Sequence, residues 1–337
     1  MRYLILVLSC IFAPSYGMEF LNNGPYKIPA LGLGTFSVRD EVELTSALNE
    51  ALETGYRHFD TAAIYMNEHI VGKVLNEWIS SGKLKRDELF ITTKLSLFDE
   101  QPGLVENAIK TSLKKLQLDY IDLWLIHFPV AVQITVEKEA ITLPTDLEGV
   151  WKEMEQQVAL GRTRTIGLSN FNISQIKRIQ NVAKIKPANL QIETHLYFQQ
   201  NKLRSFARKN NITVVAYSPL ASPAMPQFYK EALTSGAPLP NIFNDSAISA
   251  IAKKHKKTNA QVALKYLLQS GLVVIPRSTN PKRIRENFDI FNFHLDDGDM
   301  LALKRLDRGK KAKVFLMLNL AKEMTKHPEY PFRENLP

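Results

Sequence analysis

Four side chains with complementary acid–base chemistry each occur at or just after an apolar segment. Asp60 ends one such segment, Tyr65 follows five residues later, and Lys94 and His127 end the next two segments. A buried carboxylate is costly unless it is paired, so Asp60 needs a cationic partner, and Lys94 is the expected one. The Lys94 ammonium would then lie near the Tyr65 hydroxyl, where a cation favours the phenolate and lowers the pKa of the tyrosine.

This set of groups can deliver a proton to a carbonyl group that is being reduced. Tyr65 would protonate the developing alkoxide, while His127 donates a hydrogen bond to the same oxygen. An acid beside a carbonyl also needs an electron donor, most simply the hydride of a nicotinamide. The sequence offers no nucleophile paired with a base and no His/Cys cluster with metal-ligand spacing, so covalent nucleophilic catalysis and a metal site are not favoured.

Each of these residues alone also has an ordinary structural interpretation. A single histidine after a strand is usually structural, a single lysine usually extends to solvent, and Tyr65 could pack at a helix start. Their position at three successive strand ends favours a site over coincidence. Two other functions stay open. The protein could bind a cofactor without catalysis or have only a structural role, on the same barrel fold that is predicted below. It could instead be a secreted barrel glycosidase that uses Asp60 and Glu193 as paired carboxylates. The glycosidase would leave Lys94 and Tyr65 without a role.

The elements that position these residues follow a repeating pattern of apolar strand and amphipathic helix. Eight strands are predicted, at residues 30–36, 57–62, 89–95, 121–128, 163–170, 188–195, 212–220 and 272–278. Eight helices are predicted at 41–54, 68–81, 103–116, 146–160, 173–183, 199–210, 245–256 and 281–288. Nearly continuous apolar strands separated by helices indicate a parallel sheet, and eight such units favour a closed (β/α)8 TIM barrel.

The remaining segments fit one barrel domain over residues 18–337. A hairpin around Asn23-Gly24 would cover the bottom of the barrel. Two long loops, 128–145 and 221–244, and the C-terminal loop from about residue 308 are longer than ordinary connections, so we expect them to shape a substrate pocket. Chemistry in such a barrel lies at the carboxyl ends of the strands, where the four groups above are found.

Composition limits the partners. The net charge is +9 over 337 residues, but the densest basic run, "KKHKK" at 253–257, lies on a predicted helix and reads as a solvated face. No nucleic-acid partner is therefore expected, and an anionic small molecule would suit the charge. No stretch after the N-terminal segment is long and apolar enough to cross a membrane.

The N-terminal segment resembles a secretory signal peptide over residues 1–17. One arginine precedes an apolar run from Leu4 to Ala13, and small residues follow it. The sole cysteine, Cys10, lies inside this segment, so cysteine gives no information on the redox compartment of the mature chain. Export to the ER lumen or outside the cell is expected if the signal is used, and a cytoplasmic location if it is not. Sequons at Asn172, Asn211 and Asn244 add weak support for secretion.

The chain resembles the aldo-keto reductase family over nearly all of the mature sequence. The matching motifs, in order, are "GYRHFDTAAIY", "LFITTKL", "DYIDLWLIHFP", "TIGLSNF", "AYSPL" and "IPRSTNPKRIRENFDIF". The resemblance implies a monomeric barrel that binds NADPH in an extended form and acts on a small-molecule carbonyl substrate. No G-x-G-x-x-G fingerprint follows any predicted strand, as expected for such a barrel.

The resemblance also implies a role for individual residues. The catalytic group would be Asp60, Tyr65, Lys94 and His127. The cofactor would be contacted by Gly34, Thr35, Asp60, Ser169, Asn170, Gln191, Tyr217, Ser218, Leu220, Ser222, Arg277, Ser278, Arg283, Glu286 and Asn287. The substrate would be contacted by Phe36, Ile64, His127 and Phe128. Two arginines, Arg277 and Arg283, suit the 2′-phosphate of NADPH, since a guanidinium can bind phosphate through two hydrogen bonds.

Three departures from the family pattern bear on the substrate. Arg277 stands where the family commonly has lysine, and Phe36, Ser96 and Phe128 stand at positions often held by tryptophan. Ser96 in particular is expected to leave room for a substrate bulkier than a simple sugar. Together with the signal peptide, this indicates a subclass that includes secreted insect ecdysteroid 3-ketone reductases, with a 3-dehydroecdysteroid as a candidate substrate.

Overall fold

The barrel predicted from sequence is present in the computed structural model, which describes residues 18–223, 225–235 and 241–336. The proposed signal peptide, with Cys10, lies outside the described residues. Eight parallel strands are paired in the order β12-β11-β10-β9-β6-β5-β4-β3. They are β3 (Leu33–Gly34), β4 (His58–Asp60), β5 (Phe90–Leu95), β6 (Ile121–Ile126), β9 (Thr163–Ser169), β10 (Asn189–Glu193), β11 (Thr213–Tyr217) and β12 (Val273–Val274).

The barrel is closed by hydrogen bonds between its first and last strands. The Gly32 amide donates to the Val274 carbonyl at 2.9 Å, and the Gly34 amide donates to the Pro276 carbonyl at 3.1 Å. Leu31 and Val274 also form a parallel bridge. The segment before β3 therefore pairs with β12, and all eight predicted strands belong to one barrel.

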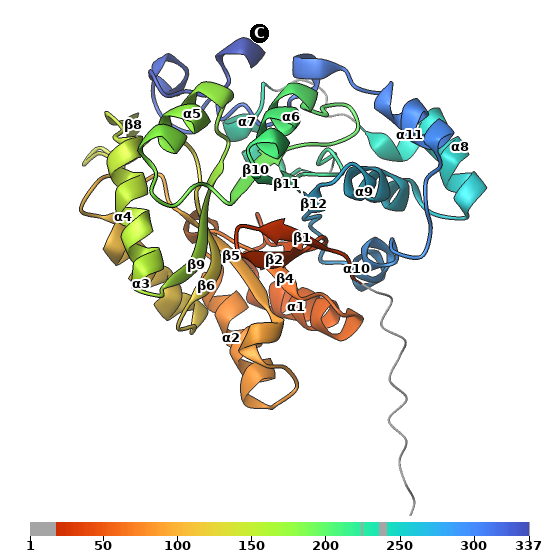
Figure 1. Cartoon of the computed structure of the whole chain (residues 1–337), viewed down its shortest axis with the longest axis horizontal. Helices are drawn as coiled ribbons and strands as arrows, with labels where there is room; N and C mark the ends of the chain where they lie inside the picture. Colours follow the sequence, from red (N-terminus) through yellow and green to blue (C-terminus); the bar gives the residue numbers. More distant parts are fainter. Residues whose placement is uncertain (1–17, 224, 236–240, 337) are drawn as a thin grey trace, which may run out of the picture.

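Helices surround the strands in a ring (Figure 1). They are α1 (Glu41–Thr54), α2 (Glu68–Ser80), α3 (Val105–Leu116), α4 (Leu147–Ala159), α5 (Ile173–Val182), α6 (Asn201–Lys209), α7 (Gln227–Leu233), α8 (Ser246–His255), α9 (Asn259–Gln269), α10 (Pro281–Phe288) and α11 (Asp297–Lys304). Short 3-10 turns are η1 (Ala63–Tyr65), η2 (Arg86–Glu88), η3 (Ile242–Asn244), η4 (Gly309–Ala312), η5 (Met324–Lys326) and η6 (Arg333–Asn335). None of the helices in the described part of the chain combines the length and apolarity that a membrane span requires.

Local sequence explains the helix boundaries that the prediction found. The Asp40 carboxylate caps α1 by accepting from the Glu43 amide at 2.8 Å, and Gly55 ends the helix with φ at 113°, a conformation that favours glycine. Asn280 caps α10 by accepting from the Arg283 amide, and Pro281 occupies the first turn. Both helices occur at the predicted residues because these signals are local.

Three helices were missed by the prediction: α7, α9 and α11. Helix α9 is buried without interruption from Gln261 to Leu268, between its neighbours and the barrel. Its polar residues Gln261, Lys265 and Gln269 recur every four positions, so the sequence does carry a helical period here, which the prediction overlooked. Helix α7 lies inside the long loop 221–244, and α11 follows the last helix that was predicted.

The predicted hairpin covers the bottom of the barrel. It consists of β1 (Phe20–Asn23) and β2 (Tyr26–Pro29), and in Figure 1 it lies near the centre of the ring of helices. The Asn23 amide donates to Thr165 at 2.7 Å and accepts from Asn189 at 3.2 Å, so the turn sits at the amino ends of β9 and β10. The barrel mouth at the opposite end is left for the site.

The long segments at the mouth are themselves structured. Loop 128–145 contains a hairpin of β7 (Val132–Ile134) and β8 (Ala140–Thr142). The C-terminal segment pairs with this hairpin where the Lys322 amide donates to the Ala140 carbonyl at 2.7 Å. It also bonds to the end of α7, where the Leu316 amide donates to the Leu233 carbonyl at 2.7 Å. The loop 221–244 and the C-terminal segment line a cavity above the strand ends, whereas Phe128 alone does so from the loop 128–145.

Candidate active site

The cavity at the barrel mouth collects most of the residues predicted from the sequence. Its volume is about 1060 Å³. Every predicted catalytic, cofactor and substrate residue contributes to its wall except Thr35 and Lys94. Lys94 does not line the cavity itself. Its side chain is fully buried and is paired with Asp60, which does line the cavity. The position at the carboxyl ends of the strands agrees with the general rule for this barrel.

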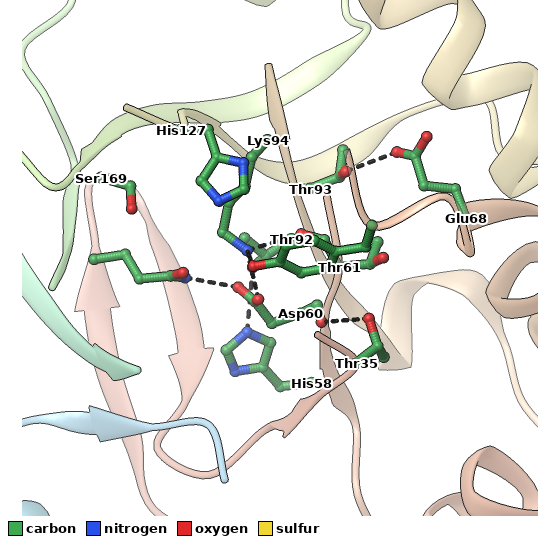
Figure 2. Close-up of polar contacts among 12 residues, drawn as sticks. Thr35, His58, Asp60, Thr61, Glu68, Thr92, Thr93, Lys94, His127 and Ser169 are labelled. Carbon is green, nitrogen blue, oxygen red and sulfur yellow. Dashed lines mark hydrogen bonds and ion pairs between the residues drawn. The ribbon is translucent and has the colours of Figure 1, made fainter. Parts of the chain in front are cut away.

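Lys94 is the centre of the polar group at the cavity floor. Its ammonium donates to an Asp60 carboxylate oxygen at 2.6 Å and to the Thr61 carbonyl at 2.8 Å. A longer hydrogen bond of 3.4 Å joins it to the Tyr65 hydroxyl. Figure 2 shows the Lys94 side chain running toward Asp60 with the His127 ring beside it. The predicted pairing of Asp60 with Lys94 is therefore confirmed.

Burial dominates the electrostatics of this group. It raises the pKa of Asp60 above its ordinary value, although Lys94 and the Gln191 amide, which donates at 2.6 Å, act in the opposite direction. Burial also raises the pKa of the Tyr65 hydroxyl, and the opposing effect of Lys94 is smaller. The sequence-based expectation of a lowered pKa for Tyr65 is thus wrong, because the effect of burial outweighs that of Lys94. The phenol is held in its neutral, proton-bearing form.

His127 faces Tyr65 across the cavity floor. The two ring centroids are 5.5 Å apart and the rings meet edge to face at 74°. Burial, followed by the charge of Lys94, keeps the pKa of His127 well below its ordinary value, so its imidazole is neutral. Nδ1 is buried and has no partner in the described part of the chain, which leaves Nε2 as the nitrogen that can serve a ligand in the cavity.

Four of the residues predicted to contact the cofactor make hydrogen bonds at the strand ends. The Asn170 amide donates to the His127 carbonyl at 2.9 Å and to the Ser169 hydroxyl at 3.1 Å. The Tyr217 hydroxyl donates to the Asn170 side-chain oxygen at 2.8 Å. Gln191, the fourth member, donates to Asp60, a role that was not predicted. These side chains therefore link the carboxyl ends of β6, β9 and β11 to one another, and Gln191 links that of β10 to β4.

Two residues do not lie where the sequence indicated. Thr35 is fully buried, and its hydroxyl donates to the Asp60 carbonyl at 3.1 Å instead of reaching the cavity. Ser96 is also buried; its hydroxyl accepts from the Phe98 amide at 3.2 Å, and the next residue, Leu97, lines the cavity in its place. The serine therefore does not line the pocket.

The cavity wall also carries positive charge. Three arginines there form no ion pair with any described residue: Arg39, Arg277 and Arg283. Burial lowers the pKa of Arg277 from its high ordinary value, but a guanidinium stays charged near neutral pH. Arg39, which was not predicted, also lines the cavity. Three further residues predicted to contact the cofactor also line the cavity: Ser278, Glu286 and Asn287.

A further group of predicted residues lies on the loop that follows β11. Ser218, Leu220 and Ser222 all line the cavity. The Ser222 hydroxyl donates to the Ser218 hydroxyl at 2.9 Å, and both residues have φ at 48°. This left-handed backbone turns the loop sharply over the cavity. Gly34 lies on the wall as well, with the Ile275 carbonyl so close that an added Cβ would be 2.9 Å from it.

The catalytic end is bounded by apolar side chains. Phe36 meets the Tyr65 ring at 5.2 Å and the Tyr229 ring at 4.9 Å. Phe36, Ile64 and Phe128 were predicted here; the wall also contains Leu97, Tyr229, Phe315, Met317 and Leu320. The last four come from the loop 221–244 and the C-terminal segment, which were expected to shape the pocket without named residues. No local pattern marks them, because they reach the cavity only through the tertiary fold.

Glu193, the second carboxylate of the glycosidase alternative, does not line the cavity. It is fully buried and accepts hydrogen bonds from the C-terminal segment, including the Val314 amide at 2.6 Å. Asp60 is likewise engaged by Lys94 and Gln191. A pair of carboxylates on opposite sides of a sugar is not formed, which weighs against the glycosidase.

Comparison with known proteins agrees with this architecture. The sequence profile of the Aldo/keto reductase family matches residues 30–308. The chain is 42% identical over 331 residues to Dihydrodiol dehydrogenase 3 of Bos taurus, covering 93% of this chain and 97% of that protein. Prostaglandin F synthase 1 of Bos taurus is 39% identical over 325 residues, covering 93% and 97% respectively. The structure of the aldose reductase from Schistosoma japonicum, 38% identical, matches with a TM-score of 0.83 over 95% of this chain and 100% of that chain. The chain is thus an oxidoreductase that belongs to the aldo/keto reductase family.

Proposed function

We propose that the protein reduces a ketone or aldehyde to an alcohol with NADPH, using Tyr65 as the general acid. The observation that carries this proposal is the placement of the Lys94 ammonium between Asp60 at 2.6 Å and Tyr65 at 3.4 Å, directly under the cavity. A phenol kept neutral by burial holds the proton that a developing alkoxide requires. Lys94 stabilises the phenolate left after the transfer, and Asp60 fixes the position of Lys94.

His127 orients the carbonyl. Its imidazole is neutral and its Nδ1 is enclosed, so Nε2 can donate a hydrogen bond to the substrate oxygen beside the Tyr65 hydroxyl. Two donors that converge on one oxygen polarise the carbonyl and stabilise the negative charge that develops there. The apolar wall around Phe36 excludes water from this point and strengthens both interactions.

The cavity fits NADPH by the chemistry of its donors. Arg39, Arg277 and Arg283 offer guanidinium groups to phosphates, while the network around Asn170 and Tyr217 offers amide and hydroxyl partners to a carboxamide. A bound NADPH would supply the hydride. The three arginines favour the additional 2′-phosphate of NADPH over NADH, and the Tyr217 ring gives the nicotinamide a flat surface.

The substrate we propose is a bulky apolar ketone, with a steroid such as a 3-dehydroecdysteroid as a specific candidate. The apolar wall contains four aromatic rings and no charged residue apart from the catalytic group: Phe36, Phe128, Tyr229 and Phe315. Such a surface gains affinity by removing apolar area from water. All the residues invoked come from one chain, so a monomer acting on a small molecule suffices.

The test is the Tyr65→Phe variant, assayed by NADPH oxidation with steroid ketones, aromatic aldehydes and sugars in parallel. We expect turnover to fall by about a hundredfold or more while the affinity for NADPH, followed by fluorescence quenching, stays within about threefold. Unchanged turnover would remove the acid role from Tyr65. Absence of NADPH oxidation by the wild-type protein with every carbonyl would favour the alternative, a barrel that binds the cofactor without catalysis or serves a structural role.

A further inference from the structure

Glu193 is a buried carboxylate at the end of β10 that the proposed chemistry does not use. Its side chain is 0% exposed. One oxygen accepts from the Val314 amide at 2.6 Å and lies 3.2 Å from His195 Nε2. The other accepts from the Lys313 ammonium at 3.0 Å and from the Phe315 amide at 3.0 Å. Three consecutive residues of the C-terminal segment are therefore attached to one strand through a single side chain.

The attachment fixes a wall of the cavity. Phe315, whose amide Glu193 holds, meets the Tyr217 ring edge to face with centroids 5.6 Å apart. Its ring centroid is also 6.4 Å from that of Phe36, which contacts Tyr65. The Phe315 ring thus lies between the tyrosine proposed to face the nicotinamide and the aromatic wall beside the general acid.

Lys313, one of the residues bound by Glu193, also contacts the far end of the C-terminal segment. The Lys313 ammonium lies 3.8 Å from the centre of the Phe332 ring, so residues 313 and 332 meet. The stretch between them contributes Phe315, Met317 and Leu320 to the cavity wall. A substitution of Glu193 would therefore disturb residues 313–315, at the start of the stretch 313–332 that contributes to the cavity wall.

We propose that Glu193 is a positioning residue that sets the place of Phe315 and thereby the width of the pocket in which a bulky ketone meets the nicotinamide. This inference rests on the proposed function and extends it to a residue that touches neither substrate nor cofactor. The carboxylate acts through the backbone of residues 313–315, and the effect reaches the substrate through the Phe315 ring.

A carboxylate is the side chain that suits this position. Four donors converge on it, and only an ionised carboxylate presents acceptors to all of them. Burial opposes ionisation, but Lys313, His195 and the Val314 amide together lower the pKa of Glu193 to about 2. A glutamine has the same shape but offers one oxygen, so its NH2 group would face two of the donors and push the segment away.

The first measurement is hydrogen exchange of the Val314 and Phe315 amides in wild type and in Glu193→Gln. It does not depend on activity, so it tests the anchor even if the proposed function fails. We expect exchange at these two amides to be at least about tenfold faster in the variant. The matched control is Glu155→Gln, since the buried Glu155 likewise accepts a backbone hydrogen bond, from Ile185 at 2.8 Å, but does not line the cavity. Protection at 314 and 315 should be unchanged in the control.

The second measurement is steady-state kinetics with a bulky ketone and a small aldehyde. We expect Glu193→Gln to raise KM for the ketone by about tenfold, with kcat for the aldehyde and the affinity for NADPH within about threefold of wild type. Phe315→Leu should raise the ketone KM in the same way, and adding Glu193→Gln to it should have little further effect, because both act on one wall. Glu155→Gln should leave KM unchanged.

Several results would overturn the proposal. An unchanged ketone KM in Glu193→Gln, an additive effect in the double variant, or an equal loss in Glu155→Gln would each reduce Glu193 to a general stabilising residue. Should Glu193→Gln not fold, Glu193→Asp replaces it in both measurements, because it keeps the charge but is too short to hold both amides, and the same criteria apply. Failure of the wild type to reduce any carbonyl would refute the proposed function, and the exchange result would still decide whether the anchor exists.

Discussion

Replacing Lys94 with methionine should destabilise the protein in a way that depends on pH. The change removes hydrogen bonds of 2.6 Å to Asp60 and 2.8 Å to the Thr61 carbonyl, while the aliphatic stem keeps a similar volume. Asp60 is then buried with Gln191 as its remaining side-chain partner. Removing one partner of a buried pair typically costs about 3–5 kcal/mol, because it leaves a charge without compensation, and we expect a loss of this size at about pH 7.5.

The pH dependence follows from the direction of the Asp60 pKa. Burial already raises this pKa in the wild type, and loss of Lys94 raises it further. Between the unfolded pKa near 4 and the raised folded pKa, the folded variant binds a proton that the unfolded chain does not. Its stability therefore falls as pH rises, by about 1.4 kcal/mol per pH unit. At about pH 5 the loss should shrink to about 1–2 kcal/mol, because Asp60 is then protonated at little cost.

The assay is urea unfolding at the two pH values, followed by tryptophan fluorescence. The control is Lys265→Met: the Lys265 side chain is 5% exposed, but its partner Glu19, at 3.8 Å, is 55% exposed and stays in water. We expect the control to lose less than about 1 kcal/mol, equally at both pH values. A loss for Lys94→Met that is as small as the control, or that is the same at both pH values, would refute the account of a buried pair.

Four further predictions follow from the same geometry. Since burial raises the pKa of Tyr65, carbonyl reduction should show no loss of kcat/KM up to about pH 9, whereas kcat/KM for alcohol oxidation should rise with pH; a loss of reduction near neutral pH would contradict the assignment. Arg283→Ala should raise KM for NADPH by about 10–100-fold and KM for NADH by less than about threefold, as measured by steady-state kinetics. Gly34→Ala places a methyl group 2.9 Å from the Ile275 carbonyl and should cost about 1–3 kcal/mol in urea unfolding. We also propose that residues 1–17 act as a signal peptide: expression in secretory cells should release a chain that begins near residue 18, and a glycosidase should increase its mobility if the exposed Asn244 carries a glycan.

The strands of the barrel were predictable because burial on both faces leaves a simple mark in the sequence. Each of the eight apolar runs contains a strand, and the helices with clear caps, such as α1 with Asp40 and Gly55, were placed within a residue or two. The prediction missed two helices that lie outside the regular repeat of one helix after each strand. Helix α7 has only seven residues and lies inside the long loop after the predicted strand 212–220, and α9 is a second helix after that strand, although its polar residues Gln261, Lys265 and Gln269 recur at a helical spacing of four.

The site was predictable to the extent that strand ends determine it. Asp60, Lys94 and His127 end successive strands, so their convergence follows from the barrel alone. The direction in which a side chain points, and contacts between residues far apart in the sequence, could not be predicted. The Thr35 hydroxyl turns inward to a carbonyl, and Glu193 finds Lys313 at a separation of 120 residues, where no short pattern connects them. The sign of the Tyr65 pKa was wrong because it depends on the degree of burial, which residue types alone do not give.

The seam between β3 and β12 has a consequence for biosynthesis. The strand that completes the barrel is the last of the eight to leave the ribosome, and until then β3 and β11 are both edge strands with unpaired amides and carbonyls. Such edges pair readily with other chains. Nascent or truncated forms that end before residue 273 should therefore aggregate, and cellular chaperones would have to shield both edges until the final strand arrives.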